Sequence, residues 1–202
     1  VAHDENAVTN YRNLLKRPGN PVDDFLLLDG IGAVAINTGV NIILATIVVL
    51  AIGGDINGPT IGGILTIAGF SVKGKHARNI LPVMLGIILS GLMRGGGAVV
   101  TPAAQLALLF GTTLAPISGT YGFPAGIVAG FIHSCVVLYA GAGYSGVNLY
   151  NNGFAGGLVA IVMHSVLSEF FRPKEYSKPS DSMLPKPLHD EDVNIDDLYF
   201  HE

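Results

Sequence analysis

The chain contains a run of 74 residues, Gly95 to Ser168, without a single Asp, Glu, Lys or Arg. A second run, Gly30 to Gly54, is free of charge for 25 residues. A helix of a soluble protein buries one stripe and turns a charged or polar face to water, and neither run offers such a face. About 20 predominantly apolar residues cross the hydrocarbon core of a bilayer. The two runs therefore predict an integral membrane protein of several packed transmembrane helices.

The composition excludes several classes of function. Half of the residues are hydrophobic and 13% are charged, against about 25% charged residues in an ordinary soluble domain. No basic patch is interleaved with aromatic residues, so we expect no nucleic-acid binding. Cys135 is the only cysteine, which excludes an intrachain disulfide bond and a multi-cysteine metal site. Because the phosphate-loop, zinc-protease and nucleophile-elbow motifs are also missing, we expect no enzyme activity, no catalytic residue, no metal and no cofactor.

Six apolar segments predict an all-α, polytopic fold with about six transmembrane crossings, some of them short, broken or re-entrant. The segments are Leu26–Ile52, Pro59–Val72, Ile80–Met93, Val99–Leu114, Phe123–Ala142 and Leu149–Phe171. The second segment would reach only about 20 Å as a helix, so it tilts, recruits flanking residues or turns back. Asp55–Gly63 and Gly111–Pro124 are too rich in Gly, Pro and Thr to form regular lipid-facing helices. Glycine makes up 27 of the 202 residues, which favours close helix packing through small residues.

Charge divides the chain into three parts. Residues 1–24 form a polar lead-in or linker, residues 25–172 the helical membrane domain, and residues 173–202 an acidic, proline-containing tail that we expect to be mostly disordered. Lys and Arg cluster before the first segment, in the 73–78 loop and after the sixth segment. Short loops rich in Lys and Arg stay in the cytoplasm, and six crossings place all three clusters on that side. We therefore expect a multi-pass protein of the cell membrane with both termini cytoplasmic.

A shift of 94 residues aligns two parts of the membrane domain. It places Asn57 on Asn151 and Gly62-Gly63 on Gly156-Gly157, among other matches. Residues 30–68 and 124–162 are thus predicted to be two copies of one unit, which consists of a long apolar segment, an outer turn with Asn and a Gly-Gly segment. Because four crossings separate the copies, they share one orientation and the repeat is parallel. The alternative is chance matching in a chain rich in glycine and aliphatic residues.

Few polar side chains interrupt the apolar segments, and these are the candidates for a solute pathway. Asn37 and Asn41 are four residues apart, so they share one helix face near the middle of the first segment. The full set of pathway candidates is Asn37, Asn41, Asn57, Gln105, His133, Asn152 and His164. Asp29 and Glu169 lie about one turn inside the cytoplasmic boundary and are candidates for an ionisable gate. The alternative for each residue is structural, because amides and neutral histidines also join neighbouring helices through hydrogen bonds.

Four stretches carry a family resemblance: Pro21–Gly32 (PVDDFLLLDGIG), Asn57–Gly63 (NGPTIGG), Gly111–Gly119 (GTTLAPISG) and Asn148–Gly157 (NLYNNGFAGG). On these motifs the chain resembles the bacterial multi-pass membrane family called domain of unknown function 1576, or DUF1576, over about residues 20–172. Members of that family are longer than this chain, and the chain begins with Val1 rather than Met. The resemblance therefore implies the carboxy-terminal half of a longer protein, and it implies no activity and no functional residue.

The leading hypothesis is a transporter or channel for a small polar solute or ion, with its pathway between the two repeats. The scarcity of charge favours a neutral solute or proton-coupled movement over a divalent cation, which binds carboxylates. The alternative is a non-transporting membrane scaffold or sensor whose acidic tail, residues 173–202, recruits a cytoplasmic partner. Besides the lipid bilayer, the expected partners are a missing amino-terminal half or further copies of the chain in a homo-oligomer.

Overall fold

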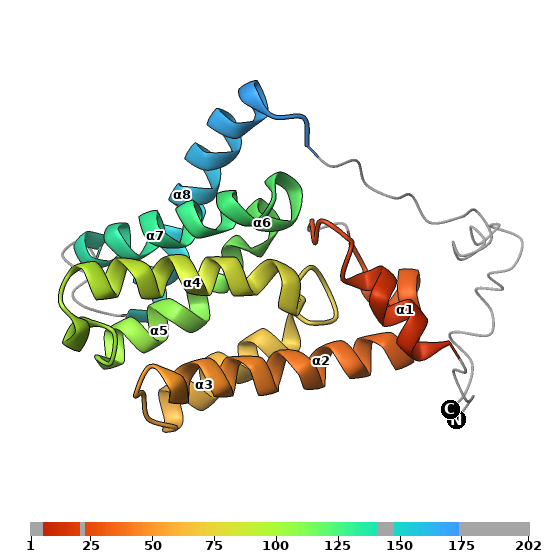
Figure 1. The fold of residues 1–202 in the computed structure, drawn as a ribbon, viewed down its shortest axis with the longest axis horizontal. Coiled ribbons are helices and arrows are strands. Elements are labelled where there is room, and N and C mark those ends of the chain that lie inside the picture. Colours follow the sequence, from red (N-terminus) through yellow and green to blue (C-terminus); the bar gives the residue numbers. More distant parts are fainter. Residues whose placement is uncertain (1–5, 21–22, 141–147, 174–202) are drawn as a thin grey trace, which may run out of the picture.

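The computed structural model describes residues 6–20, 23–140 and 148–173, and in these ranges the protein is built from helices. In chain order the elements are α1 (Ala7–Leu14), α2 (Phe25–Ala51), α3 (Gly58–Gly69), α4 (Ala77–Met93), the 3-10 helix η1 (Gly96–Ala98), α5 (Pro102–Phe110), the 3-10 helix η2 (Gly111–Leu114), α6 (Ala115–Tyr121), α7 (Phe123–Ala140) and α8 (Asn148–Phe170). Figure 1 shows α4 in the middle, with α2 and α3 on one side and α6, α7 and α8 on the other. The predicted all-α fold is confirmed.

The long helix α2 agrees with the predicted first segment to within one residue at each end. Asp24 begins the helix, because its carboxylate accepts hydrogen bonds from two backbone N–H groups of the first turn, which have no acceptor inside the helix. Gly30 has a φ of +84° and interrupts the helix after its first turn, a conformation that residues with a Cβ rarely adopt. The short first part packs with α1 in a cluster around Leu14 and Phe25. The polar lead-in thus contains a helix that is attached to the membrane domain.

The second apolar segment forms α3, which has only 12 residues and is about 18 Å long at 1.5 Å per residue. Asn57 caps its start: its side chain accepts the N–H of Thr60, whose hydroxyl bonds back to Asn57. After Gly69 the chain enters a loop, residues 70–76, in which Ser71 and Lys75 are buried. The cytoplasmic position predicted for the 73–78 loop stays a prediction, and the structure adds that two side chains of this loop are buried in the protein.

The most extensive helix contact is between α4 and α7, and glycine makes it possible. A methyl group added to Gly86 would collide with the backbone of Ile127, and one added to Gly130 would collide with the backbone of Val83. In lipid, helices associate through such close backbone approach rather than through a hydrophobic driving force. The high glycine content predicted close helix packing, and at the contact between α4 and α7 two glycines allow it.

The predicted fourth segment, Val99–Leu114, is divided in the structure. Its α-helix begins only at Pro102, and the Thr101 side chain caps its start. Proline suits this first turn because an N–H group there would have no acceptor inside the helix. It ends at Phe110, and the chain continues as the tighter η2 before α6 begins. The break falls in Gly111–Pro124, the stretch whose Gly, Pro and Thr content argued against a regular lipid-facing helix.

Within the described residues, three helices are long and apolar enough to cross a bilayer: α2, α7 and residues 151–170 of α8. α2 buries polar side chains in the protein and exposes apolar ones on its outer face. Asn37 and Asn41 are buried, while Ile31 and Ile43 on the outer face are 72% and 59% exposed. An exposed surface this apolar belongs in lipid. The chain is therefore a helical protein of the membrane, and the number of six crossings stays a prediction.

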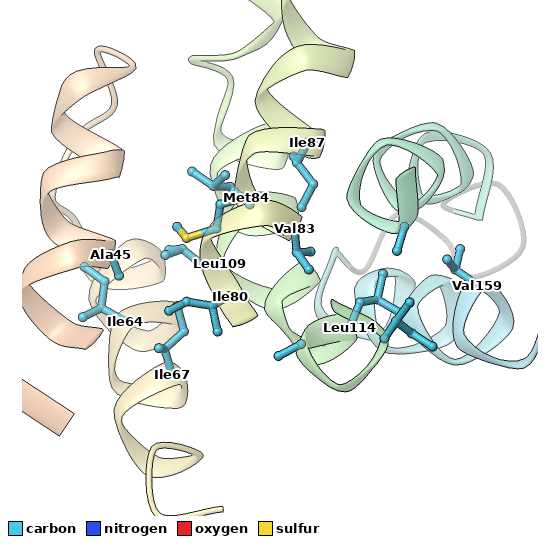
Figure 2. Packing of buried hydrophobic residues seen from close by; sticks show 14 of the residues in the cluster. Ala45, Ile64, Ile67, Ile80, Val83, Met84, Ile87, Leu109, Leu114 and Val159 are labelled. Atoms are coloured by element: carbon cyan, nitrogen blue, oxygen red, sulfur yellow. The ribbon is translucent and has the colours of Figure 1, made fainter. Parts of the chain in front are cut away.

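Aliphatic side chains fill the space between the helices (Figure 2). Ala45 of α2 and Ile64 and Ile67 of α3 face Ile80 and Met84 of α4, and the cluster continues to Leu114 and to Val159 of α8. Lipid tails are as apolar as these side chains, so their burial alone does not select one helix arrangement. Polar contacts and glycine crossings are needed to specify it.

The predicted repeat, residues 30–68 and 124–162, stays a prediction as well. Each half contains a long helix that packs against the next one, α2 with α3 and α7 with α8. However, α8 has 23 residues and α3 has 12. Asn57 stands at a helix cap, as expected for a turn, whereas Asn151 and Asn152 lie inside α8, which begins at Asn148.

Candidate functional site

Asn37 and Asn41 hold the buried loop that follows α3. The amide nitrogen of Asn37 donates to the backbone oxygens of Ser71 and Lys75, each over 2.8 Å. The amide nitrogen of Asn41 donates to the Ser71 hydroxyl over 2.7 Å and to the backbone oxygen of Lys75 over 3.2 Å. Both side chains share one helix face, as their spacing predicts, and their Oδ1 atoms are buried with no partner among the described residues. The loop is thereby fixed against the middle of α2.

The loop directs Lys75 into the protein. Its ammonium group donates to the Thr112 hydroxyl over 3.0 Å and lies 4.9 Å from the centre of the Phe70 ring. Lys75 lies outside the candidate spans and is 7% exposed, and this burial lowers the pKa of its ammonium group to about 8. In the described part of the chain no carboxylate forms an ion pair with it. Because Thr112 belongs to η2, the bond joins two places where helices are interrupted.

A second buried polar contact joins α7 to α8. His133 Nε2 lies 3.3 Å from Asn152 Oδ1. A carbonyl oxygen only accepts, so Nε2 is the donor and carries the ring proton. The other ring nitrogen, Nδ1, is buried without a hydrogen-bond partner in the described residues. Gly111 of η2 packs on this ring, since a methyl group there would come within 2.8 Å of it. The His133–Asn152 pair therefore lies beside the same helix interruption as Thr112.

A cavity of about 390 Å³ lies next to this pair, where α4 ends and α5 and α8 begin. We call it the Arg94 cavity. Its polar lining residues are Arg94, Thr101, Ser134, Asn151 and Asn152, and most of the others are alanines. The Arg94 guanidinium donates to the hydroxyl and backbone oxygens of Ser134 over 2.9 and 3.2 Å, which holds the cation at the wall. Among the described residues that line this cavity there is no Asp or Glu. Its chemistry suits a neutral polar solute or an anion better than a cation.

Buried acceptor atoms around the Arg94 cavity lack partners. One of these atoms is Oδ1 of Asn151, which lines the cavity. The other is Nδ1 of His133, whose ring bonds to the lining residue Asn152; neither atom has a partner among the described residues. Buried polar groups in proteins are nearly always hydrogen-bonded to protein or to ordered water. Water, or a solute that carries N–H or O–H groups, would satisfy these two acceptors.

The other pathway candidates have local partners. Asn57 caps α3, and the amide nitrogen of Gln105 donates to the backbone oxygen of Val100 over 2.8 Å. His164 Nδ1 lies 2.9 Å from the Tyr121 hydroxyl at an exposed position. The structure brings Asn152 and His133 together at the cavity, and it leaves the role of Asn57 and His164 in a pathway as a prediction.

The two gate candidates have different surroundings. Asp29 is 5% exposed, and its carboxylate forms an ion pair with Arg17 over 2.7 Å. Glu169 is exposed near the end of α8. The helices that carry them, α2 and α8, lie on opposite sides of α4 (Figure 1). The two carboxylates therefore lie apart, one buried in an ion pair and the other exposed.

Sequence reasoning missed Lys75, Thr112, Arg94 and Ser134. The two basic residues were assigned to loops at the membrane surfaces, where lysine and arginine are common. Thr112 and Ser134 carry small hydroxyls that are frequent in membrane helices and gave no signal. The one usable signal was the shortness of the segment before Lys75, because a helix that stops halfway leaves the next residues inside the protein.

Among the described residues, no three His, Cys, Asp or Glu side chains lie close enough to share a metal ion. A protein-family model matches residues 3–169, and it is described as Protein of unknown function (DUF1576). The match covers most of the chain and confirms the resemblance seen in its motifs. No curated protein and no solved structure matches the chain.

Proposed function

We propose that this chain, which belongs to the DUF1576 family, moves a small polar solute across the membrane without catalysing a reaction. The observation that carries the proposal is the Arg94 cavity. Its wall includes Asn152, the partner of the buried His133, so polar groups continue from the cavity into the protein. The proposal includes six crossings and a parallel repeat. Six crossings put the three basic clusters on one side of the membrane and the Arg94 cavity on the other.

The interrupted helices support the same function. Transporters place their binding sites where membrane helices are broken, because the freed backbone groups and helix ends can bind a solute. Here the loop 70–76 and η2 are two such interruptions, and Lys75 and Thr112 join them. In the proposed pathway a solute enters at the Arg94 cavity, passes His133 and reaches η2. Asn37 and Asn41 border its far side.

The cavity chemistry points to neutral solutes with N–H or O–H groups, such as small amides or alcohols. Such a solute can accept from Arg94 and donate to the unpaired Oδ1 of Asn151, both of which belong to the cavity lining. A divalent cation would meet the charge of Arg94 without a lining carboxylate to offset it.

Stopped-flow light scattering on proteoliposomes tests the proposal with urea, acetamide, glycerol and ammonium at two pH values. We expect at least one solute to enter faster than into empty liposomes. Asn152→Leu removes the amide between the cavity and His133 and should slow entry about tenfold, the effect of about 1.4 kcal/mol on a barrier. Thr66→Val is the matched control, because that hydroxyl is exposed and bonds only within its own helix.

Two results would contradict the proposal. One is entry no faster than into empty liposomes for every solute, measured with protein shown to be folded. The other is unchanged entry in Asn152→Leu and His133→Leu. The first result would favour the scaffold alternative, because a scaffold leaves the permeability of the bilayer unchanged.

A further inference from the structure

A second cavity, of about 140 Å³, lies at the opposite end of α4 and α7, and we call it the basic cavity. It is formed by the residues after α1, the first residues of α4 and the start of α7. Its basic lining residues are Lys16, Arg17, His76 and Arg78, and its apolar ones include Leu15 and Phe123. The proposed solute pathway does not use it.

The charges around the basic cavity leave an excess of positive charge. Arg17 is balanced by Asp29, whose carboxylate lies 2.7 Å from its Nε atom and is not part of the lining. Asp23, also near Arg17, is buried and accepts the N–H of Asn20. Lys16 and Arg78 are exposed, and no ion pair with either one occurs among the described residues. These two cations are therefore available to an anion.

The geometry of the backbone adds to this preference. His76 Nε2 lies 3.0 Å from the backbone oxygen of Arg17 and so ties the residues after α1 to the start of α4. Arg78 is in the first turn of α4, and Phe123 is the first residue of α7. In the first turn of α4 the Asn79 N–H already bonds to the His76 backbone oxygen, and Pro124 of α7 has no N–H. These helix ends therefore attract an anion mainly through the positive end of the helix dipole. A phosphate group binds favourably at such helix ends and to Arg and Lys side chains.

We propose that the basic cavity binds a phosphate group, carried either by an anionic phospholipid or by a free solute. The lipid source is favoured because Phe123 is 48% exposed at the start of a candidate membrane span. An acyl chain can lie along α7 while the headgroup phosphate enters the cavity. Basic pockets at the cytoplasmic ends of membrane helices bind anionic headgroups in this way, and the basic residues predict that this end is cytoplasmic.

Thermal unfolding of the full chain in detergent tests this inference. The probes are dioleoylphosphatidylglycerol, inorganic phosphate and dioleoylglycerol, which lacks the phosphate. We expect saturable stabilisation by phosphatidylglycerol and none by dioleoylglycerol. The double variant Lys16→Gln/Arg78→Gln should raise the half-saturating concentration at least about tenfold, because two charge-assisted contacts are lost. The control is Arg12→Gln/Lys73→Gln, which removes the same charge from exposed residues outside the cavity lining.

The possible outcomes distinguish a specific phosphate site in the basic cavity from diffuse attraction to positive charge. Saturation by inorganic phosphate, with the same dependence on Lys16 and Arg78, would support the site and assign it to a free phosphate-bearing solute. Equal weakening in both double variants would mean diffuse attraction and would overturn the inference, as would equal stabilisation by dioleoylglycerol or no saturable stabilisation by either phosphate probe. Because all four substituted residues are exposed, we expect both double variants to fold. A thermal unfolding transition measured without any probe checks this directly. The liposome assay concerns the opposite end of the molecule, so either proposal can fail alone.

Discussion

The ammonium group of Lys75 donates a 3.0 Å hydrogen bond to the Thr112 hydroxyl, while the backbone oxygen of the same lysine accepts from Asn37 and Asn41. One residue thus contacts α2 through its backbone and η2 through its side chain. The bond joins the two interruptions on which the proposed pathway depends. A buried cation without a carboxylate partner is unfavourable, and ionisable groups kept inside membrane proteins commonly serve function.

The stability of the protein should depend on the charge of Lys75. Its pKa is about 8 in the folded protein and 10.5 as a free side chain, so between these values the unfolded state binds more protons. Stability should therefore rise as the pH increases from about 8 to 10.5. The rise is at most roughly 3–4 kcal/mol, the free-energy equivalent of the difference between the two pKa values.

Thermal unfolding in detergent at several pH values measures this effect. Lys75→Met should flatten the rise, whereas Lys73→Met should keep it, because Lys73 is exposed in the same loop. An identical pH dependence in wild type and Lys75→Met would show that the ammonium group is solvated in the folded protein.

Asn37→Leu should destabilise the protein. The substitution removes the 2.8 Å donor of the Ser71 backbone oxygen and one of the two donors of the Lys75 backbone oxygen, which keeps Asn41. The buried Ser71 oxygen is left unsatisfied, which costs roughly 1–3 kcal/mol. Thr38→Val is the neighbouring control, because the Thr38 hydroxyl bonds only to Val34 of its own helix. Chemical unfolding of both variants in mixed micelles compares them. Equal stability of the two variants would mean that the loop is held in some other way.

Gly86→Ala should weaken the contact between α4 and α7. The added methyl group would collide with the backbone of Ile127, and overpacking of this kind costs about 1–3 kcal/mol or more. Gly157→Ala is the matched control in another apolar helix, since nothing lies within 4 Å of a methyl group at that position. The yield of monodisperse protein and its melting temperature report the difference. A Gly86→Ala protein as stable as Gly157→Ala would show that the two helices can separate at little cost.

The sequence was sufficient for the features that depend on composition. The ends of α2 and α8 follow from long apolar runs, and each lies within one residue of its prediction. The Gly, Pro and Thr content of Gly111–Pro124 indicated an irregular stretch, but it did not predict that Val99–Leu114 would divide into α5 and the 3-10 helix η2. The amide contacts of Asn37 to Lys75 were out of reach as well. They join residues 38 positions apart, and no local pattern encodes which loop a buried amide meets.

Two of the predicted pathway residues lie at the candidate site, and their role in a pathway stays a prediction. His133 and Asn152 were both candidates on account of their polarity in apolar surroundings, and they form a hydrogen bond in the structure. Arg94 was not a candidate, because a charged residue at a helix end has an ordinary explanation at the membrane surface. Its contact with Ser134 depends on the close packing of α4 and α7, which single residues do not reveal.

Cysteine accessibility most directly tests whether a water-filled polar cavity lies inside a lipid-facing helical shell. In a Cys135→Ala background, Ala104→Cys places a thiol in the wall of the Arg94 cavity, and Ile43→Cys places one on the 59% exposed outer face of α2. A membrane-impermeant, charged thiol reagent applied to membranes should modify Ala104→Cys from one side only and leave Ile43→Cys unmodified. Equal modification of both positions would mean that the face of α2 lies in water, and it would contradict the membrane placement and the cavity together.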